Sequence, residues 1–163
     1  MVDEIEVLSK LTGLLHEEEG DVQRMLQTVV DQTALLMGVP RVSAWLLDDS
    51  RTRLIAGARA GMPLHNKPDF GYQLGQGLIG WIAENCQVIR AGNAEDDPRF
   101  LPRPGRVEPL KSFLGVPIIA TKKKCTGVLS AVAPEVEYFS RHHEQLLIVV
   151  AGICGDRLEL ARR

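Results

Sequence analysis

The sequence is poor in several features that other classes of protein require. Its three cysteines are dispersed and form no CxxC pair, so we expect reduced thiols and no disulfide framework. With 19 basic and 21 acidic residues the formal net charge is −2, which gives no reason to expect binding to nucleic acid or to an anionic membrane. The longest strongly apolar run, residues 146–153, is too short to cross a bilayer, and the acidic N-terminus is no signal peptide. These absences predict a cytoplasmic protein.

What is present is an orderly succession of helical and strand patterns. Apolar residues at helical spacing predict helices over 2–16 and 20–38, a short helix over 78–85 and a final helix over 140–162 that begins at Ser140. Strand patterns cover 41–49, 53–61 and 87–90, and 112–120 with 125–133 form the clearest hairpin. The segments 62–74 and 91–112 have the composition of irregular connections. This order predicts one α+β domain over residues 1–163, with an antiparallel sheet within 41–133.

One glycine motif has two interpretations. Gly75, Gly77 and Gly80 have the spacing G-x-G-x-x-G of dinucleotide-binding proteins. That fold needs an apolar strand leading into the first glycine, a longer helix after the last, and a parallel crossover beyond it. The approach here is HNKPDFGYQL, and the chain continues into an antiparallel hairpin. We therefore interpret the glycines as residues that permit a tight turn and let an apolar helix pack close to the sheet.

Several segments, in order, resemble the GAF domain family. They are GQGLIGWIAENCQVI, the loop containing EDDPRF, KSFLGVPI and TGVLSAVAPEVEYFSRHHEQLL. The resemblance extends from Leu11 to Arg162 and implies a six-stranded antiparallel sheet with the terminal helices on one face. On the other face the helix 78–85 and the loop 91–112 would close a pocket. Members of this family bind cyclic nucleotides, bilins, haem, small metabolites or nothing known, so the fold does not settle a function.

The resemblance implies a regulatory module that is not an enzyme. We expect an unidentified small molecule to bind beneath the loop 91–112 and to control an attached histidine kinase, cyclic-dinucleotide enzyme or AAA+ transcription activator. Arg90, if it points inward from its strand, is the best candidate to hold an anionic group. The residues expected to line the pocket are Tyr72, Trp81, Arg90, Phe100, Ser112, Phe113 and Ser130.

The terminal helices are the second functional element. Residues 2–15 and 144–161 have apolar stripes wide enough to pack on the sheet and to leave a seam for a second copy. In the family such helices form a homodimer, and the last one continues into the output domain. The alternative is packing within one chain alone.

Two other functions remain open. A ligand-free dimerisation scaffold would fill the pocket with its own side chains. A free methionine-R-sulfoxide reductase, the catalytic exception in this family, would need an activated cysteine facing the pocket and a resolving partner. In those enzymes one cysteine stands where this chain has Ile79 and another in the long loop, and residues 91–112 contain none. The pattern of a covalent bilin site is missing, and Asn66-Lys67 does not continue as the cyclic-nucleotide signature does.

Other polar residues have simpler interpretations than chemistry. His142 and His143 are adjacent, so on a helix their side chains diverge and cannot share a metal ion. Asp97 precedes Pro98, which favours an Asx turn with local pairing to Arg99 over a pair of catalytic carboxylates. Trp45 is either a core residue or a platform on which a ligand stacks.

Overall fold

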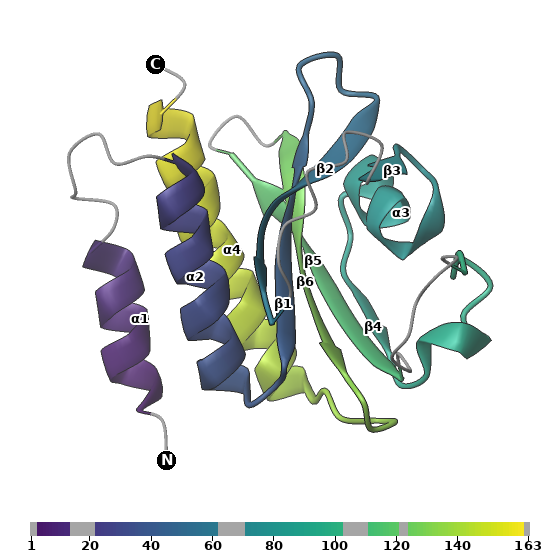
Figure 1. The fold of residues 1–163 in the computed structure, drawn as a ribbon, viewed down its shortest axis with the longest axis horizontal. Helices are drawn as coiled ribbons and strands as arrows, with labels where there is room; N and C mark the ends of the chain where they lie inside the picture. Colours follow the sequence, from purple (N-terminus) through teal and green to yellow (C-terminus); the bar gives the residue numbers. More distant parts are fainter. Residues whose placement is uncertain (1–2, 14–21, 62–70, 103–110, 121–123, 162–163) are drawn as a thin grey trace.

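Residues 3–13, 22–61, 71–102, 111–120 and 124–161 are described in the structure, a computed structural model of the chain. Among these residues six strands form one antiparallel sheet in the order β3-β2-β1-β6-β5-β4 (Figure 1). This confirms the sheet that the resemblance implies. The strands are β1 (Arg41–Leu47), β2 (Arg53–Ala60), β3 (Gly71–Gln73), β4 (Ile89–Ala91), β5 (Ser112–Ile119) and β6 (Cys125–Ala133).

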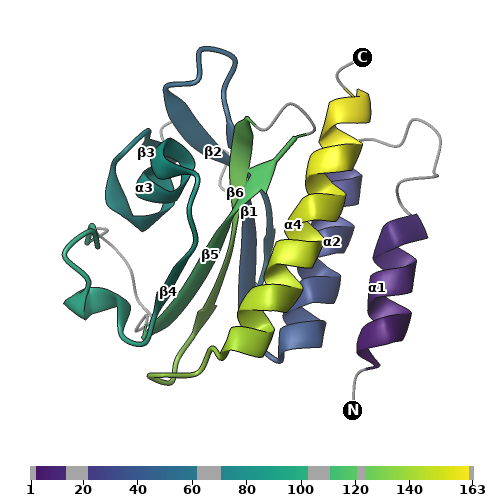
Figure 2. The same cartoon turned by 180° about the vertical axis from the view of Figure 1, so that it is seen from behind.

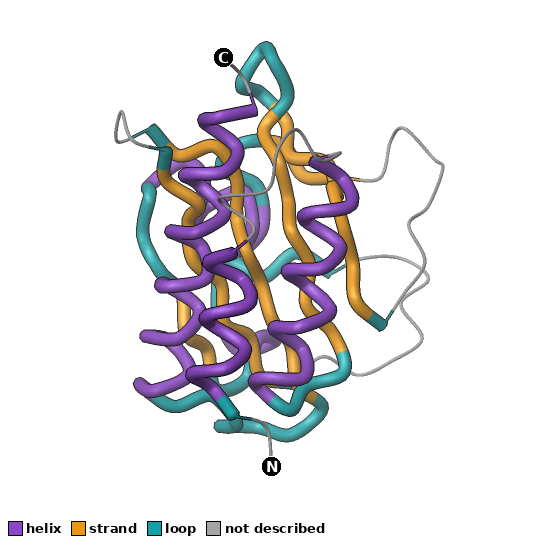
Figure 3. Tube along the Cα trace, turned by 90° about the vertical axis from the view of Figure 1, so that its left-hand side faces the viewer, coloured by secondary structure: helices purple, strands orange, loops and turns teal. Residues whose placement is uncertain are grey.

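Helices cover both faces of the sheet. α2 (Val22–Met37) and α4 (Arg141–Ala161) lie on one face, and α1 (Glu4–Gly13) lies outside them and packs on both (Figures 1 and 2). We expected the N-terminal helix to pack on the sheet; it packs on α2 and α4 instead, because these two already cover that face. All three run along the strands behind them (Figure 3). The other face carries α3 (Gly77–Asn85) and, after β4, the 3-10 turn η2 (Ala94–Asp96). No helix within the described ranges is long and apolar enough to cross a membrane.

Alternation along the strands gives the sheet a hydrophobic core on each face. In β1, Val42 and Ala44 are buried in the core shared with α2 and α4, whereas Trp45 and Leu47 are buried in the core shared with α3. In β6, Leu129 belongs to the helical core. Since burying a large aliphatic side chain contributes roughly 1.5–3 kcal/mol, both cores stabilise the central strands.

The predicted elements agree with the structure except near their ends and at β3. The hairpin of β5 and β6 is confirmed, and so is the helix start at Ser140, whose Oγ accepts a hydrogen bond from the backbone N–H of His143 at 3.3 Å. The prediction of an irregular segment over 62–74 is wrong at β3, where Tyr72 pairs with Leu54 across the edge of the sheet. Residues 14–21, 62–70, 103–110 and 121–123 lie outside the described part, so the predictions there stay predictions.

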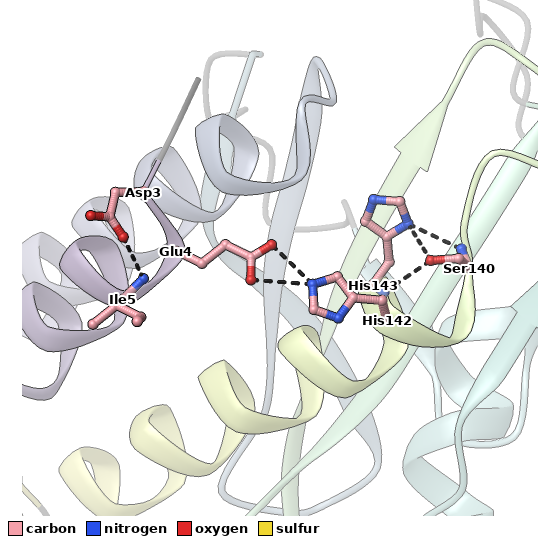
Figure 4. Close-up of polar contacts among 6 residues, drawn as sticks. All are labelled: Asp3, Glu4, Ile5, Ser140, His142 and His143. Carbon is pink, nitrogen blue, oxygen red and sulfur yellow. Dashed lines mark hydrogen bonds and ion pairs between the residues drawn. The ribbon is translucent and has the colours of Figure 1, made fainter.

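A polar contact joins the first turn of α1 to the first turn of α4. Glu4 Oε1 lies 2.9 Å from Nε2 of His142, and Figure 4 shows the Glu4 side chain reaching across to it. His143 turns toward Ser140 instead, and its Nδ1 accepts the backbone N–H of Ser140 at 3.0 Å. The two histidines thus diverge, as expected on a helix. Because Glu4 and His142 are both exposed, burial of Val7 and Leu11 holds α1 more firmly than this surface contact does.

The glycine motif works as the sequence suggested. Gly75 and Gly77 have φ values of 84° and 69°, in the left-handed region that side chains disfavour. A Cβ on Gly80 would lie 2.3 Å from the carbonyl oxygen of Gln73. The motif therefore makes the turn after β3 and brings α3 close to the backbone of the preceding strand.

Substitution of Gly80 by alanine tests this close approach. We expect Gly80→Ala to lower the free energy of unfolding by about 1–3 kcal/mol, because backbone must move to accept the new methyl group. The matched control is Gly152→Ala in α4, where a Cβ meets nothing within 4 Å and helix propensity should raise stability by roughly 0.5–1 kcal/mol. Urea denaturation of both variants measures the difference, and equal midpoints would contradict the assignment.

Candidate ligand-binding site

A cavity of about 180 Å³ lies between the sheet and α3. Its floor comes from β1, β2, β5 and β6, and its roof comes from the start of α3 and the residues after η2. The described lining residues are Pro40, Arg41, Ser43, Trp45, Arg59, Tyr72, Leu78, Ile79, Phe100, Leu101, Phe113, Ser130, Val132, Ala133 and Pro134.

A row of polar residues crosses the floor from strand to strand. Ser43 of β1 pairs with Arg59 of β2 on one side and with Ser130 of β6 on the other. Directly opposite residues have Cβ atoms only about 5 Å apart, so the three side chains are neighbours. Both serines are more than nine-tenths buried.

Arg59 reaches the cavity because β2 contains a bulge. Ala44 pairs with Ala58, but Trp45 pairs with Ala56, so Gly57 is an extra residue in β2. Without it, Arg59 would share a face with residues 53, 55 and 57, opposite to Leu54 and Ala56. The bulge reverses the alternation, and Arg59 joins Leu54 on the cavity side while Ala58 is buried against the helices.

Aromatic side chains form one wall of the cavity. The ring of Trp45 is 3% exposed and meets Tyr72 edge to face, with ring centroids 5.2 Å apart. The guanidinium of Arg59 lies 5.3 Å from the centroid of Trp45, within the range of a cation–π contact. The indole N–H of Trp45 donates to Oγ of Ser130 at 3.1 Å, and Nε of Arg59 donates to Oγ of Ser43 at 3.4 Å.

Four of the seven residues predicted to line the pocket do line this cavity: Tyr72, Phe100, Phe113 and Ser130. Ser43 and Arg59 also line the cavity, and neither was predicted from the sequence. Simple strand alternation places Arg59 on the opposite face, and only the bulge, which a glycine within a strand can signal, would have indicated otherwise.

Arg90, Ser112 and Trp81 lie outside the described lining. The prediction that Arg90 points into the pocket is wrong. Its Nε lies 3.5 Å from a carboxylate oxygen of Glu144 in α4. Its strand neighbour Ile89 occupies the α3 side, and successive side chains of a strand point to opposite faces. Ser112 is fully buried, and its hydroxyl forms hydrogen bonds with backbone groups. One of them is the N–H of Tyr138, which donates to Oγ of Ser112 at 2.9 Å. These positions give Arg90 and Ser112 roles in joining elements.

Trp81 belongs to a small cluster over the roof of the cavity. The guanidinium of Arg99 lies 4.3 Å from its ring centroid and also binds Asp97 with two hydrogen bonds, at 2.9 and 2.7 Å. Asp97 Oδ1 accepts the backbone N–H of Arg99 at 2.9 Å, which confirms the predicted Asx turn. The Arg99 hydrogen bonds lower the pKa of Asp97, so this carboxylate is charged at neutral pH.

The three cysteines stand apart from the cavity lining. Burial raises the pKa of Cys125 to about 11 and that of Cys154 to about 12. Cys86 is half-buried at the C-terminal end of α3. Because the thiolate is the nucleophile, the raised pKa values of Cys125 and Cys154 disfavour the reactive form of both thiols at neutral pH. Among the described residues no three His, Cys, Asp or Glu side chains gather as metal ligands would.

Comparison with known proteins now identifies the family. The sequence profile described as GAF domain matches residues 19–159. The chain belongs to the GAF domain family. No curated protein matches this GAF domain.

Solved structures share the fold of this GAF domain over nearly its whole length. The GAF domain of a phosphoenolpyruvate-protein phosphotransferase from Coxiella burnetii has a TM-score of 0.87 at 23% identity, covering 98% of this chain and 94% of that chain. The corresponding domain from Acinetobacter gives 0.82 at 24%, with 99% and 97% covered. The free methionine-R-sulfoxide reductase from Neisseria meningitidis, solved with its substrate, gives 0.82 at 21%, with 99% and 94% covered. GAF domains of phosphotransferases and a sulfoxide reductase are therefore both similar to this chain in fold, and the fold alone does not decide the function.

Alkylation tests the state of the thiols in this GAF domain. At about pH 8 we expect iodoacetamide to modify Cys86 first in the folded protein, since Cys125 and Cys154 are buried and protonated. Peptide mass spectrometry follows each cysteine, and a sample unfolded in urea, in which all three react, is the control. Modification of Cys125 as fast in the folded protein as in urea would contradict its burial.

Proposed function

We propose that this GAF domain is a non-catalytic regulatory module that binds a small molecule in the cavity between the sheet and α3. The observation that carries the proposal is the cavity, because a scaffold without a ligand would fill that space with its own side chains. Tyr72, Phe100, Phe113 and Ser130 are proposed as ligand contacts. Binding would alter the packing of the terminal helices in a homodimer and thereby the activity of an output domain.

A hydrogen-bonded junction at Ser112 supports transmission from the loop over the cavity to the helices. Ser112 Oγ donates to the carbonyl oxygen of Glu135, and it lies 3.4 Å from the carbonyl oxygen of Gly92, where the loop begins. The hydroxyl of Tyr138, whose N–H binds Ser112, donates to the carbonyl of Met37 at the end of α2 at 2.6 Å. These hydrogen bonds connect Gly92 to the segment just before α4 and to the end of α2, so a displacement of the loop has a path to both helices. Such coupling has an effect only if two arrangements bind the ligand with different affinity.

Exposed apolar side chains support the proposed homodimer. Ile5 of α1 is 78% exposed, Leu35 of α2 is 61% exposed, and Ile148 and Val149 of α4 are 46% and 50% exposed. A second copy would remove such surface from water at about 25 cal/mol per Å².

A sulfoxide reductase has less support than a sensor. It needs a reactive thiol at the ligand, whereas Cys86, Cys125 and Cys154 are absent from the described lining. The likeness to the reductase concerns the fold.

The proposed output domain is a histidine kinase, a cyclic-dinucleotide enzyme or an AAA+ transcription activator. The similarity to GAF domains of two phosphoenolpyruvate-protein phosphotransferases adds a phosphotransfer enzyme to these. The proposed location is the cytoplasm, because the described cysteines are free thiols, as a reducing compartment keeps them. We propose no direct contact with nucleic acid.

A thermal-shift screen of metabolites tests ligand binding. A ligand that binds only the native state stabilises it by about 2.7 kcal/mol at a hundredfold excess over its dissociation constant, which raises the melting temperature. We expect Val132→Phe, which narrows the cavity, to abolish the shift, and Ile119→Phe, on an exposed part of β5, to retain it. A shift that persists in Val132→Phe comes from binding elsewhere, and a screen without hits favours the scaffold.

Sedimentation velocity tests the homodimer. We expect the wild-type chain to sediment as a dimer and Val149→Asp to sediment as a folded monomer, because a carboxylate would be desolvated in the interface. Ile55→Asp, an equally drastic change at an exposed position of β2, should leave the dimer intact. A monomeric wild type, or dissociation by both variants alike, would argue against an interface at α4.

A further inference from the structure

The polar row on the cavity floor has a specific hydrogen-bonding state. Oγ of Ser43 accepts a hydrogen bond from Arg59, and Oγ of Ser130 accepts one from Trp45. Within the described residues neither serine hydroxyl donates to an acceptor. Both serines line the cavity, so two hydroxyl hydrogens can be donated to a ligand there, beside the guanidinium of Arg59.

Donors in this arrangement fit a ligand oxyanion. The charged residues among the described lining are Arg41 and Arg59, and both are cations. Where apolar walls remove an anion from water, the anion binds only if hydrogen-bond donors and positive charge replace the water that it loses. Two serines whose Cβ atoms lie about 5 Å apart across paired strands can each donate a hydroxyl hydrogen to one oxygen of a carboxylate, and charge-assisted hydrogen bonds of this kind are roughly twice as strong as neutral ones.

The rest of the lining restricts the size and polarity of the ligand. Trp45, Tyr72, Phe100 and Phe113 present aromatic surface to the space next to the polar row. The volume of about 180 Å³ is close to that of an apolar cavity of roughly 150 Å³ that accommodates benzene. A ring or short aliphatic chain with one acidic group therefore matches both parts of the cavity.

We propose that the cavity selects a small organic monocarboxylate, whose carboxylate binds Ser43, Ser130 and Arg59 and whose apolar body packs against the aromatic wall. This assignment rests on the proposed function, since it names the class of ligand for the same cavity. It transfers to Arg59 the anion-holding role that the sequence suggested for Arg90.

Matched pairs of small probes test the proposal. Calorimetric titration compares benzoate with benzamide and phenylacetate with phenylacetamide, which share shape and differ in charge. We expect each acid to bind the wild-type domain about tenfold or more tightly than its amide, the difference that a charge-assisted hydrogen bond supplies. Phenyl phosphate is included to distinguish a carboxylate from a phosphate.

Substitutions locate the effect on the floor of the cavity. In Arg59→Met the acid and its amide should bind about equally well, with the affinity for the amide unchanged. In Ser130→Ala the ratio of the two affinities should fall severalfold. Arg53→Met, in the same strand but outside the described lining, is the matched control and should keep the preference. Circular dichroism confirms that each variant is folded, and Ser130→Ala gives the answer if Arg59→Met does not fold.

The outcomes separate the two proposals. Amides that bind as tightly as the acids, phenyl phosphate that binds more tightly than benzoate, or an acid preference that survives Arg59→Met would each overturn the carboxylate assignment and leave a ligand-binding module. If none of these probes and no metabolite of the thermal-shift screen binds, the proposed function falls together with the assignment.

Discussion

The alternation of side chains along β1 and β6 divides the molecule into two cores, and the cavity exists because of that division. Val42, Ala44 and Leu129 bind the sheet to α2 and α4, while Ser43, Trp45 and Ser130 are left for the opposite face. The helical side is closely covered, whereas the other side is covered by one short helix and by loop residues. The strands hold the side chains beneath the cavity in fixed positions, whereas the short helix and the loop residues cover the cavity less completely.

Strong local signals allowed most of the fold to be predicted from the sequence. The hairpin 112–133 has strand-forming residues on both sides of a polar turn, and Ser140 begins α4 with a side-chain hydrogen bond. The glycines of α3 were interpreted correctly because the surrounding segments excluded the dinucleotide fold. β3 escaped prediction because Tyr72 is extended through its pairing with Leu54, a contact between distant segments that no local pattern records.

The cavity was predictable in position and only partly in composition. Phe113 and Tyr72 were predicted to line the pocket, and both do. Arg90 was predicted to face the cavity and does not, whereas Arg59 was not predicted and does, because the direction of each side chain depends on one residue of register. A bulge at Gly57 brings Arg59 in, and the pairing of β4 with β5 turns Arg90 toward Glu144.

The two cores have no buried residue in common, and this has a consequence for how such a domain can diversify. Residues that line the cavity can change without disturbing those that hold the helices, so the two sides of the sheet can evolve separately. Near the β4 edge of the sheet, Ser112 binds the N–H of Tyr138 and Arg90 pairs with Glu144, so polar contacts there also join the sheet to the helical side. An engineered variant could exchange the residues that line its cavity and keep its terminal helices, provided that these contacts are left intact.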